Sequence, residues 1–97
     1  MQNTTWAHVT RWTEHKTPTG HWSTTRHDEE SEDFTPHELS NFLSHYTPGE
    51  RREMTHTKQG YLPYRITSPS PDKQKRDVYT IEYYDGPREV GAYTYHN

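Results

Sequence analysis

The spacing of apolar residues predicts one amphipathic helix near the middle of the chain. Within residues 34–46, apolar side chains recur at the i, i+3, i+4, i+7 spacing of a single helical face. These side chains are Leu39, Phe42, Leu43 and Tyr46. Polar residues fill the positions between them, so we expect a helix that buries one face and exposes the other.

The residues before this stripe carry the signals that start a helix. Thr35 is a favoured N-cap residue, and Pro36 falls in the first helical turn, where its missing N–H costs nothing. Glu38 follows three residues after Thr35, so the two side chains are able to form a capping box. Residues 47–50, Thr-Pro-Gly-Glu, repeat this signal, and we expect a second, short surface helix that ends near His56.

Alternating apolar and polar residues predict strands on both sides of the helix. The expected strands are residues 5–14, 21–26, 61–67, 77–84 and 89–95. In residues 5–14 apolar side chains fall on both faces, so the pattern leaves the buried face of this strand open. In residues 61–67 the alternation indicates one buried row, made of Leu62, Tyr64 and Ile66.

Residues 77–96 read as a β-hairpin that carries five tyrosines. A two-residue loop would place a proline in the ladder and put two glutamates opposite each other, whereas a four-residue loop, residues 85–88, avoids both faults. Either register turns the same side chains toward the core: Tyr79, Ile81, Tyr83, Val90 and Ala92. The opposite face then receives Tyr84, Tyr93 and Tyr95, which one helix cannot cover as well.

The predicted elements follow one another in the order ββαβββ. We expect a single small α+β domain, residues 1–97, built of two layers. One layer is an antiparallel sheet of about five strands, and the other is the amphipathic helix on one face of that sheet. The face of the sheet away from the helix is then the natural binding surface.

The composition indicates a small core that is rich in aromatic side chains. Only 26% of the residues are hydrophobic, whereas 13% are aromatic and the formal net charge is −3. Disordered chains combine low hydrophobicity with high net charge and few aromatic residues, so this composition favours a folded domain. Because such a core leaves little margin of stability, we expect either a marginal monomer or a chain completed by a larger protein or a second copy.

Cysteine usage and hydropathy indicate which kinds of site and which cellular location to expect. The chain has no cysteine, which excludes a disulfide framework and a thiolate metal site. No apolar run approaches the roughly 20 residues of a membrane span, and the first residues do not read as a signal peptide. We therefore expect no membrane association and a cytoplasmic location, which is the host cytoplasm if a phage encodes the chain.

No catalytic or nucleotide-binding motif stands in the sequence, and we expect no catalytic residue, cofactor or metal ion. The eight histidines lack the spacing of a metal site; His37 and His45, for example, do not share one line on a helix. The acidic run 28–33 lacks the ligand spacing of a calcium loop and reads as a solvated loop. A histidine-dependent hydrolase or metal-binding protein remains an alternative.

A further alternative is a domain that binds single-stranded nucleic acid through exposed aromatic rings and the basic loop 73–76. However, acidic residues bracket each basic cluster, and the net charge of −3 is negative. Dedicated nucleic-acid-binding proteins present a basic footprint, so nucleic acid is the less favoured partner.

These observations favour a non-enzymatic protein-binding module. In size and layout the chain is similar to the small accessory proteins with which phages and other mobile elements inhibit host machinery. The resemblance implies a viral inhibitor that acts by steric occupation of a larger host protein. Tyrosine and tryptophan are enriched at protein interfaces because they are large, rigid and amphipathic. The expected contact residues are Tyr84, Tyr93 and Tyr95, then Trp6 and Trp12, then Asp28, Glu29 and Glu30.

The tyrosine surface is testable by mutation. We expect the double substitution Tyr93→Ala with Tyr95→Ala to leave unfolding cooperative and to weaken partner binding by more than about 1 kcal/mol, the usual threshold of a hot spot. Calorimetric titration of the partner with the double variant measures this change. An unchanged dissociation constant would remove these two tyrosines from the contact surface.

Overall fold

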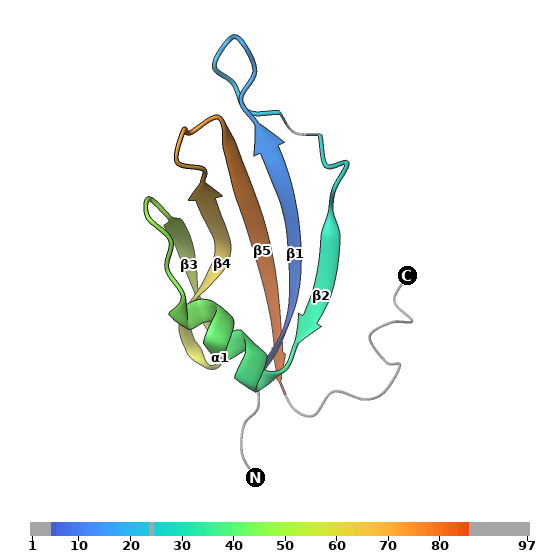
Figure 1. Cartoon of the computed structure of the whole chain (residues 1–97). Helices are drawn as coiled ribbons and strands as arrows, with labels where there is room; N and C mark the ends of the chain where they lie inside the picture. Colours follow the sequence, from blue (N-terminus) through green and yellow to red (C-terminus); the bar gives the residue numbers. More distant parts are fainter. Residues whose placement is uncertain (1–4, 24, 86–97) are drawn as a thin grey trace.

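A computed structural model of the chain describes residues 5–23 and 25–85, which form one antiparallel sheet and one helix (Figure 1). The five strands lie in the order β2-β1-β5-β4-β3, with α1 against one face of the sheet. The elements are β1 (Thr5–His15), β2 (Glu30–Phe34), α1 (Pro36–Ser44), β3 (Arg51–Thr57), β4 (Gly60–Pro69) and β5 (Lys75–Asp85). Their order, ββαβββ, confirms the predicted α+β fold with its antiparallel sheet and single helix.

Strands β1 and β5 form the centre of the sheet. They pair antiparallel along their whole length, from Thr5 opposite Asp85 to His15 opposite Lys75. Strand β2 flanks β1, and the β3–β4 hairpin flanks β5. The connection from β2 through α1 to β3 therefore carries the chain from one edge of the sheet to the other, and this crossing places the helix on one face (Figure 1).

Helix α1 begins with the predicted capping box. The Thr35 hydroxyl accepts a hydrogen bond from the Glu38 N–H at 3.2 Å, and the Glu38 carboxylate accepts one from the Thr35 N–H at 2.9 Å. Pro36 is the first helical residue, as predicted. The helix ends at Ser44, so Tyr46 lies beyond the buried stripe in which it was expected and is 72% exposed.

The main core lies between α1 and the sheet. Its buried members are Ala7, Val9, Leu39, Ile66 and Ile81. Aromatic rings complete it: the ring centroids of Phe34 and Phe42 are 5.2 Å apart, and those of Phe42 and Tyr79 are 5.3 Å apart. Tyr79 and Tyr83 face the helix side as predicted, and burial raises the pKa of Tyr83 to about 12.

The prediction of a second helix is wrong, because residues 51–57 form strand β3. The helix-start signal in residues 47–50 closes a turn instead: the Glu50 carboxylate accepts hydrogen bonds from the Thr47 N–H at 3.1 Å and the Thr47 hydroxyl at 3.3 Å. Gly49 completes this turn with a φ of +79°. A short helix with one apolar residue would bury little, whereas the ladder with β4 pairs the backbone of the whole segment.

The second strand is also displaced from its predicted position. The described part of residues 21–26 contains no strand, and Trp22 makes an isolated bridge to Lys16, the residue after β1. The acidic run 28–33, which was expected to be a solvated loop, supplies most of β2. Phe34 accounts for the position of β2. It pairs with Ala7 on β1, and its ring packs against Phe42 of the helix that follows.

Strand β5 corresponds to the first arm of the predicted hairpin, residues 77–84. Its described neighbours are β1 and, along Arg76 to Thr80, β4. The second arm, residues 89–95, lies outside the described residues. The expected contact residues Tyr93 and Tyr95 belong to this arm and lie outside the described residues as well.

The capping box provides a test of the helix assignment. We expect Thr35→Ala to lower the free energy of unfolding by about 1 kcal/mol, because the Glu38 N–H loses its acceptor at the helix N-terminus. Chemical denaturation of the variant and of the unmodified chain measures the difference. Thr35→Ser keeps the hydroxyl and serves as the control; equal midpoints for the alanine and serine variants would contradict the role of the cap.

Candidate functional site

The helix-free face of the sheet has a covered half and an open half. In the covered half the guanidinium of Arg26 lies over the Trp12 ring, 3.8 Å from its centroid. Beneath this cover Trp12 is 1% exposed and Val78 is 0% exposed. Trp12 was expected as a contact residue on an open face, but its burial places it in a second small core.

Glu14 is the buried charge that organises the covered half. It is 6% exposed and accepts hydrogen bonds from the Trp12 indole at 3.0 Å and the Arg76 guanidinium at 2.7 Å. The same guanidinium lies over the Trp22 ring at 4.3 Å. Burial alone would raise the pKa of Glu14, but the hydrogen bonds from Trp12 and Arg76, with the charge of Arg76, outweigh burial and lower the pKa.

Cross-strand pairing aligns the side chains of the open half. Thr10 lies opposite Ser31 on β2 and opposite Thr80 on β5, so hydroxyl groups form its middle row. Trp6 and Tyr84, two of the expected contact residues, lie opposite each other and are half-buried. We call this surface the open face, and its members are Trp6, His8, Thr10, Tyr64, Thr80, Glu82 and Tyr84.

Tyr64 is a member of the open face that the sequence pattern misplaced. It was expected in the buried row of β4, but it is 44% exposed, and its hydroxyl donates to the Glu53 carboxylate at 3.1 Å. The cause is a bulge: Glu53 pairs with Arg65 but Met54 pairs with Pro63, so Tyr64 is skipped in the ladder. Two shallow hollows of about 540 and 660 Å³ meet at its ring.

The three expected acidic contact residues, Asp28, Glu29 and Glu30, do not lie together on the open face. Glu29 lines the smaller hollow of the open face. Glu30 is on the helix side, where its carboxylate lies 3.4 Å from the Arg11 guanidinium. Asp28 accepts a hydrogen bond from the Thr13 N–H at 3.2 Å, and this bond holds its pKa below the usual value. Of the three, Glu29 is the one the structure brings to the open face.

Most of the arginines in the described residues are paired with carboxylates of the same chain. Five of the six arginines in the described part lie within ion-pair distance of a carboxylate. The pairs are Arg11 with Glu30 at 3.4 Å, Arg26 with Glu29 at 3.8 Å, Arg65 with Glu53 at 3.6 Å, Arg76 with Glu14 at 2.7 Å, and Arg52 with Glu50. This pairing lowers the potential that these guanidinium groups would offer to a phosphate backbone.

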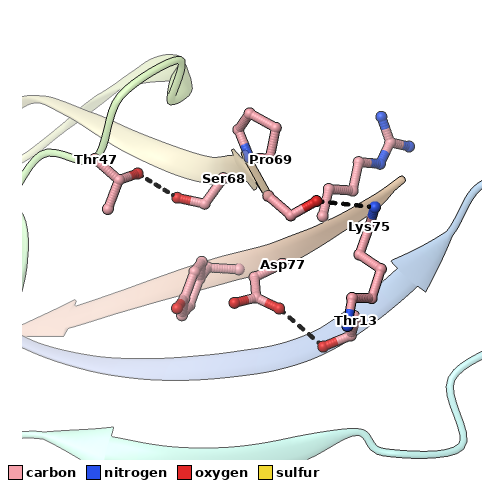
Figure 2. Close-up of a pocket in the computed structure, with 9 residues that line it drawn as sticks. Thr13, Thr47, Ser68, Pro69, Lys75 and Asp77 are labelled. Atoms are coloured by element: carbon pink, nitrogen blue, oxygen red, sulfur yellow. Dashed lines mark hydrogen bonds between the residues drawn. The ribbon is translucent and has the colours of Figure 1, made fainter. Parts of the chain in front are cut away.

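A pocket of about 390 Å³ occupies the part of the helix side that α1 leaves uncovered (Figure 2). The Asp77 carboxylate in this pocket accepts a hydrogen bond from the Thr13 hydroxyl at 2.8 Å and lies 3.6 Å from the Arg11 guanidinium. The hydroxyl oxygens of Thr47 and Ser68 are 2.6 Å apart. Because these polar groups bond to one another, a ligand would have to replace existing bonds, and the open face is the better candidate.

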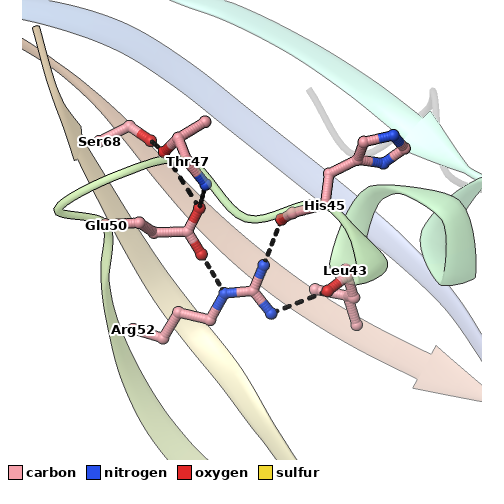
Figure 3. A network of polar contacts seen from close by, with 6 residues as sticks. All are labelled: Leu43, His45, Thr47, Glu50, Arg52 and Ser68. Atoms are coloured by element: carbon pink, nitrogen blue, oxygen red, sulfur yellow. Dashed lines mark hydrogen bonds and ion pairs between the residues drawn. The ribbon is translucent and has the colours of Figure 1, made fainter.

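Arg52 joins the end of α1 to β3 beside this pocket (Figure 3). Its guanidinium donates to the carbonyl oxygens of Leu43 at 2.9 Å and His45 at 2.7 Å, and it pairs with Glu50. The Tyr46 ring lies against the same guanidinium, 3.8 Å from centroid to carbon. The guanidinium therefore satisfies carbonyl groups that the helix C-terminus leaves without partners. Sequence reasoning missed this contact because it assigned residues 51–57 to a helix.

The described residues contain neither a cluster of metal ligands nor a membrane-spanning helix. Over residues 5–23 and 25–85, no group of three His, Cys, Asp or Glu side chains is placed to hold a metal ion, and no helix is long and apolar enough to cross a bilayer. No family model, curated protein or solved structure matches the chain. The functional conclusion therefore depends on the geometry of the chain itself.

The buried Glu14 charge generates a pH-dependent prediction. We expect Glu14→Gln to lower the free energy of unfolding at neutral pH by about 1–3 kcal/mol, because the Arg76 guanidinium loses its charged partner. Since folding lowers the pKa of Glu14, its contribution is complete above the ordinary value of about 4.3 and is lost as the pH falls through the folded pKa. The difference between the two proteins should therefore shrink in acid.

Urea titrations of both proteins from about pH 7 to about pH 3 measure this difference. Glu32→Gln, which changes an exposed glutamate, is the control. A Glu14→Gln effect that stays constant over the whole range would contradict a role for the Glu14 charge.

Proposed function

We propose that the chain is a non-enzymatic protein-binding module whose contact surface is the open face. The observation that carries this proposal is the arrangement of three aromatic rings, Trp6, Tyr84 and Tyr64, around the open half of a face opposite the helix. The module acts by steric occupation of a larger protein, as expected of a small inhibitor encoded by a phage or mobile element.

The rings of the open face are fixed before a partner arrives. Trp6 and Tyr84 are half-buried and stand on β1 and β5, the two longest strands of the sheet. The Tyr64 hydroxyl is held by Glu53 at 3.1 Å. A preorganised ring loses little conformational entropy on binding, so more of its contact energy contributes to affinity.

The polar residues between the rings define the chemistry of the partner. Thr10 and Thr80 offer hydroxyl groups that both donate and accept hydrogen bonds. Glu82 is exposed and adds a carboxylate, which is an acceptor. The surface therefore suits a protein patch that presents apolar side chains to the rings and hydrogen-bond donors to Glu82. Such a mixture of aromatic and polar groups is typical of non-obligate interfaces.

The pairing of the arginines favours a protein partner over single-stranded nucleic acid. Arg76, which was expected in the basic loop 73–76 but lies in β5, donates to the buried Glu14 carboxylate at 2.7 Å. Turning this guanidinium toward a phosphate would leave a buried carboxylate without its charged partner, which is strongly unfavourable. A nucleic-acid partner would therefore have to be held mainly by ring stacking.

Two experiments identify the partner and the surface that binds it. The tagged chain is exposed to lysate of its source with and without nuclease, and we expect a discrete protein to be retained in both cases. A photo-reactive phenylalanine is then placed at Tyr64 or at Ser40, an exposed residue of α1. We expect crosslinking to the retained protein from position 64 and not from position 40.

The contribution of Tyr64 is then measured directly. We expect Tyr64→Ala to raise the dissociation constant at least about fivefold, which corresponds to roughly 1 kcal/mol. Because the Tyr64 side chain is 44% exposed, the thermal midpoint should change little. Ser40→Ala is the matched control. Retention that is lost with nuclease, or crosslinking from position 40 alone, would refute the proposal.

A further inference from the structure

The two edges of the sheet differ in how they resist pairing with another strand. Edge strands expose backbone N–H and C=O groups, and proteins usually protect them with short length or outward charge. Strand β2 is only five residues long, and Glu32 adds an exposed carboxylate to it. Strand β3, at the other edge, is seven residues long, and no strand in the described residues pairs with its outer side.

Two of the three charged residues of β3, Arg52 and Glu53, are paired within the chain, whereas Arg51 is exposed at the start of the strand. Arg52 is held by Glu50 and by two backbone carbonyl groups at the end of α1. The Glu53 carboxylate lies 3.6 Å from the Arg65 guanidinium and accepts a hydrogen bond from Tyr64. Beyond Arg52 and Glu53, the outer edge of β3 runs from Met54 to Thr57 without a residue of formal charge.

Exposed apolar side chains gather at the same edge. The four exposed large hydrophobic residues of the described chain are Tyr46, Met54, Tyr61 and Tyr64. Met54 stands in the middle of β3, and Tyr61 lies opposite the next helix-side residue, His56, with 4.7 Å between ring centroids. Tyr46 stacks on Arg52 at 3.8 Å on the same side. A strip of rings and one thioether thus follows the helix side of β3.

We propose that β3 pairs antiparallel with β3 of a second copy of the chain, in a register centred on Met54. A two-fold axis through this position makes the contact isologous and closes the assembly as a dimer. The opposed residues are Arg51 with Thr57, Arg52 with His56, Glu53 with Thr55, and Met54 with its own copy.

The charge pattern selects this register over its neighbours. A register centred on Glu53 would put the two Glu53 carboxylates opposite each other. A register centred on Thr55 would put Arg52 opposite Lys58. The register centred on Met54 opposes no two residues of formal like charge, and it joins the exposed Met54 side chains of the two copies.

The dimer changes what the open face presents to a partner. Residues opposed in a ladder lie on the same face, so the two five-stranded sheets join into one, with both open faces on one side and both helices on the other. The self-association itself does not depend on the proposed function. If both hold, the dimer is a bivalent binder, and the second contact gains from a high effective concentration.

Single cysteines test the pairing and its register, because the chain has no cysteine of its own. In the proposed register, position 54 of one copy is opposite position 54 of the other at about 4.5–5.5 Å between Cα atoms, within disulfide reach. Under mild oxidation we expect Met54→Cys to form a crosslinked dimer. Arg51→Cys is the matched control, since its two copies would be six positions apart, roughly 20 Å. A mixture of Arg51→Cys and Thr57→Cys should crosslink as a heterodimer.

Sedimentation equilibrium tests the association without a crosslink. We expect a dimer of the unmodified chain, and we expect Met54→Lys to raise its dissociation constant at least about tenfold, because two lysines would oppose each other. Ser40→Lys adds the same charge on α1 and should leave association unchanged; thermal unfolding checks that both variants fold.

A monomer at every concentration, or equal crosslinking from positions 51 and 54, would overturn the inference. A monomer that still binds its partner through Tyr64 would leave the proposed function intact. A dimer whose Tyr64→Ala variant binds as tightly as the unmodified chain would overturn the proposed function alone.

Discussion

The ladder between β1 and β5 is the contact on which the rest of the structure depends. It joins positions 60 to 80 residues apart, so its formation requires the closure of nearly the whole described chain. This ladder contributes to both cores: Val9 and Ile81 on the helix side, and Trp12 and Val78 on the helix-free side. Strands β2 and β4 then add to its two flanks. The open face is also built on this ladder, so folding and the candidate binding surface have the same origin.

Aromatic rings and guanidinium groups take the place of the aliphatic side chains that the composition lacks. On the helix side, Phe42 contacts both Phe34 and Tyr79. On the other side, Arg26 covers Trp12 while keeping its own charge at the surface. A guanidinium stacked on a ring contributes about 0.5–1 kcal/mol at exposed sites and also shields apolar surface from water. This substitution explains how a chain with 26% hydrophobic residues covers parts of both faces of its sheet.

Local signals in the sequence predicted the elements that local interactions decide. The capping box and apolar stripe of residues 34–46 located α1, and alternation located β4 and β5. Pairing with neighbouring strands of the sheet decided the rest. Residues 51–57 became a strand because β4 lies beside them, and residues 30–34 because Ala7 lies beside Phe34. Tyr64 changed face through a one-residue bulge, which alternation along a single strand cannot reveal. The open face was therefore predictable in its Trp6–Tyr84 half but not in its Tyr64 half.

Glu53 connects the open face with the edge strand β3. The Glu53 carboxylate of β3 accepts a hydrogen bond from the Tyr64 hydroxyl of the open face and also pairs with Arg65. A surface prepared in this way has little long-range field to steer a partner, because opposite charges a few ångströms apart cancel at a distance. If the open face binds a partner as proposed, recognition depends on ring contacts and hydrogen-bond geometry at short range. A weak field would give slower association than electrostatic steering allows, and bivalent presentation by two copies would raise the apparent affinity.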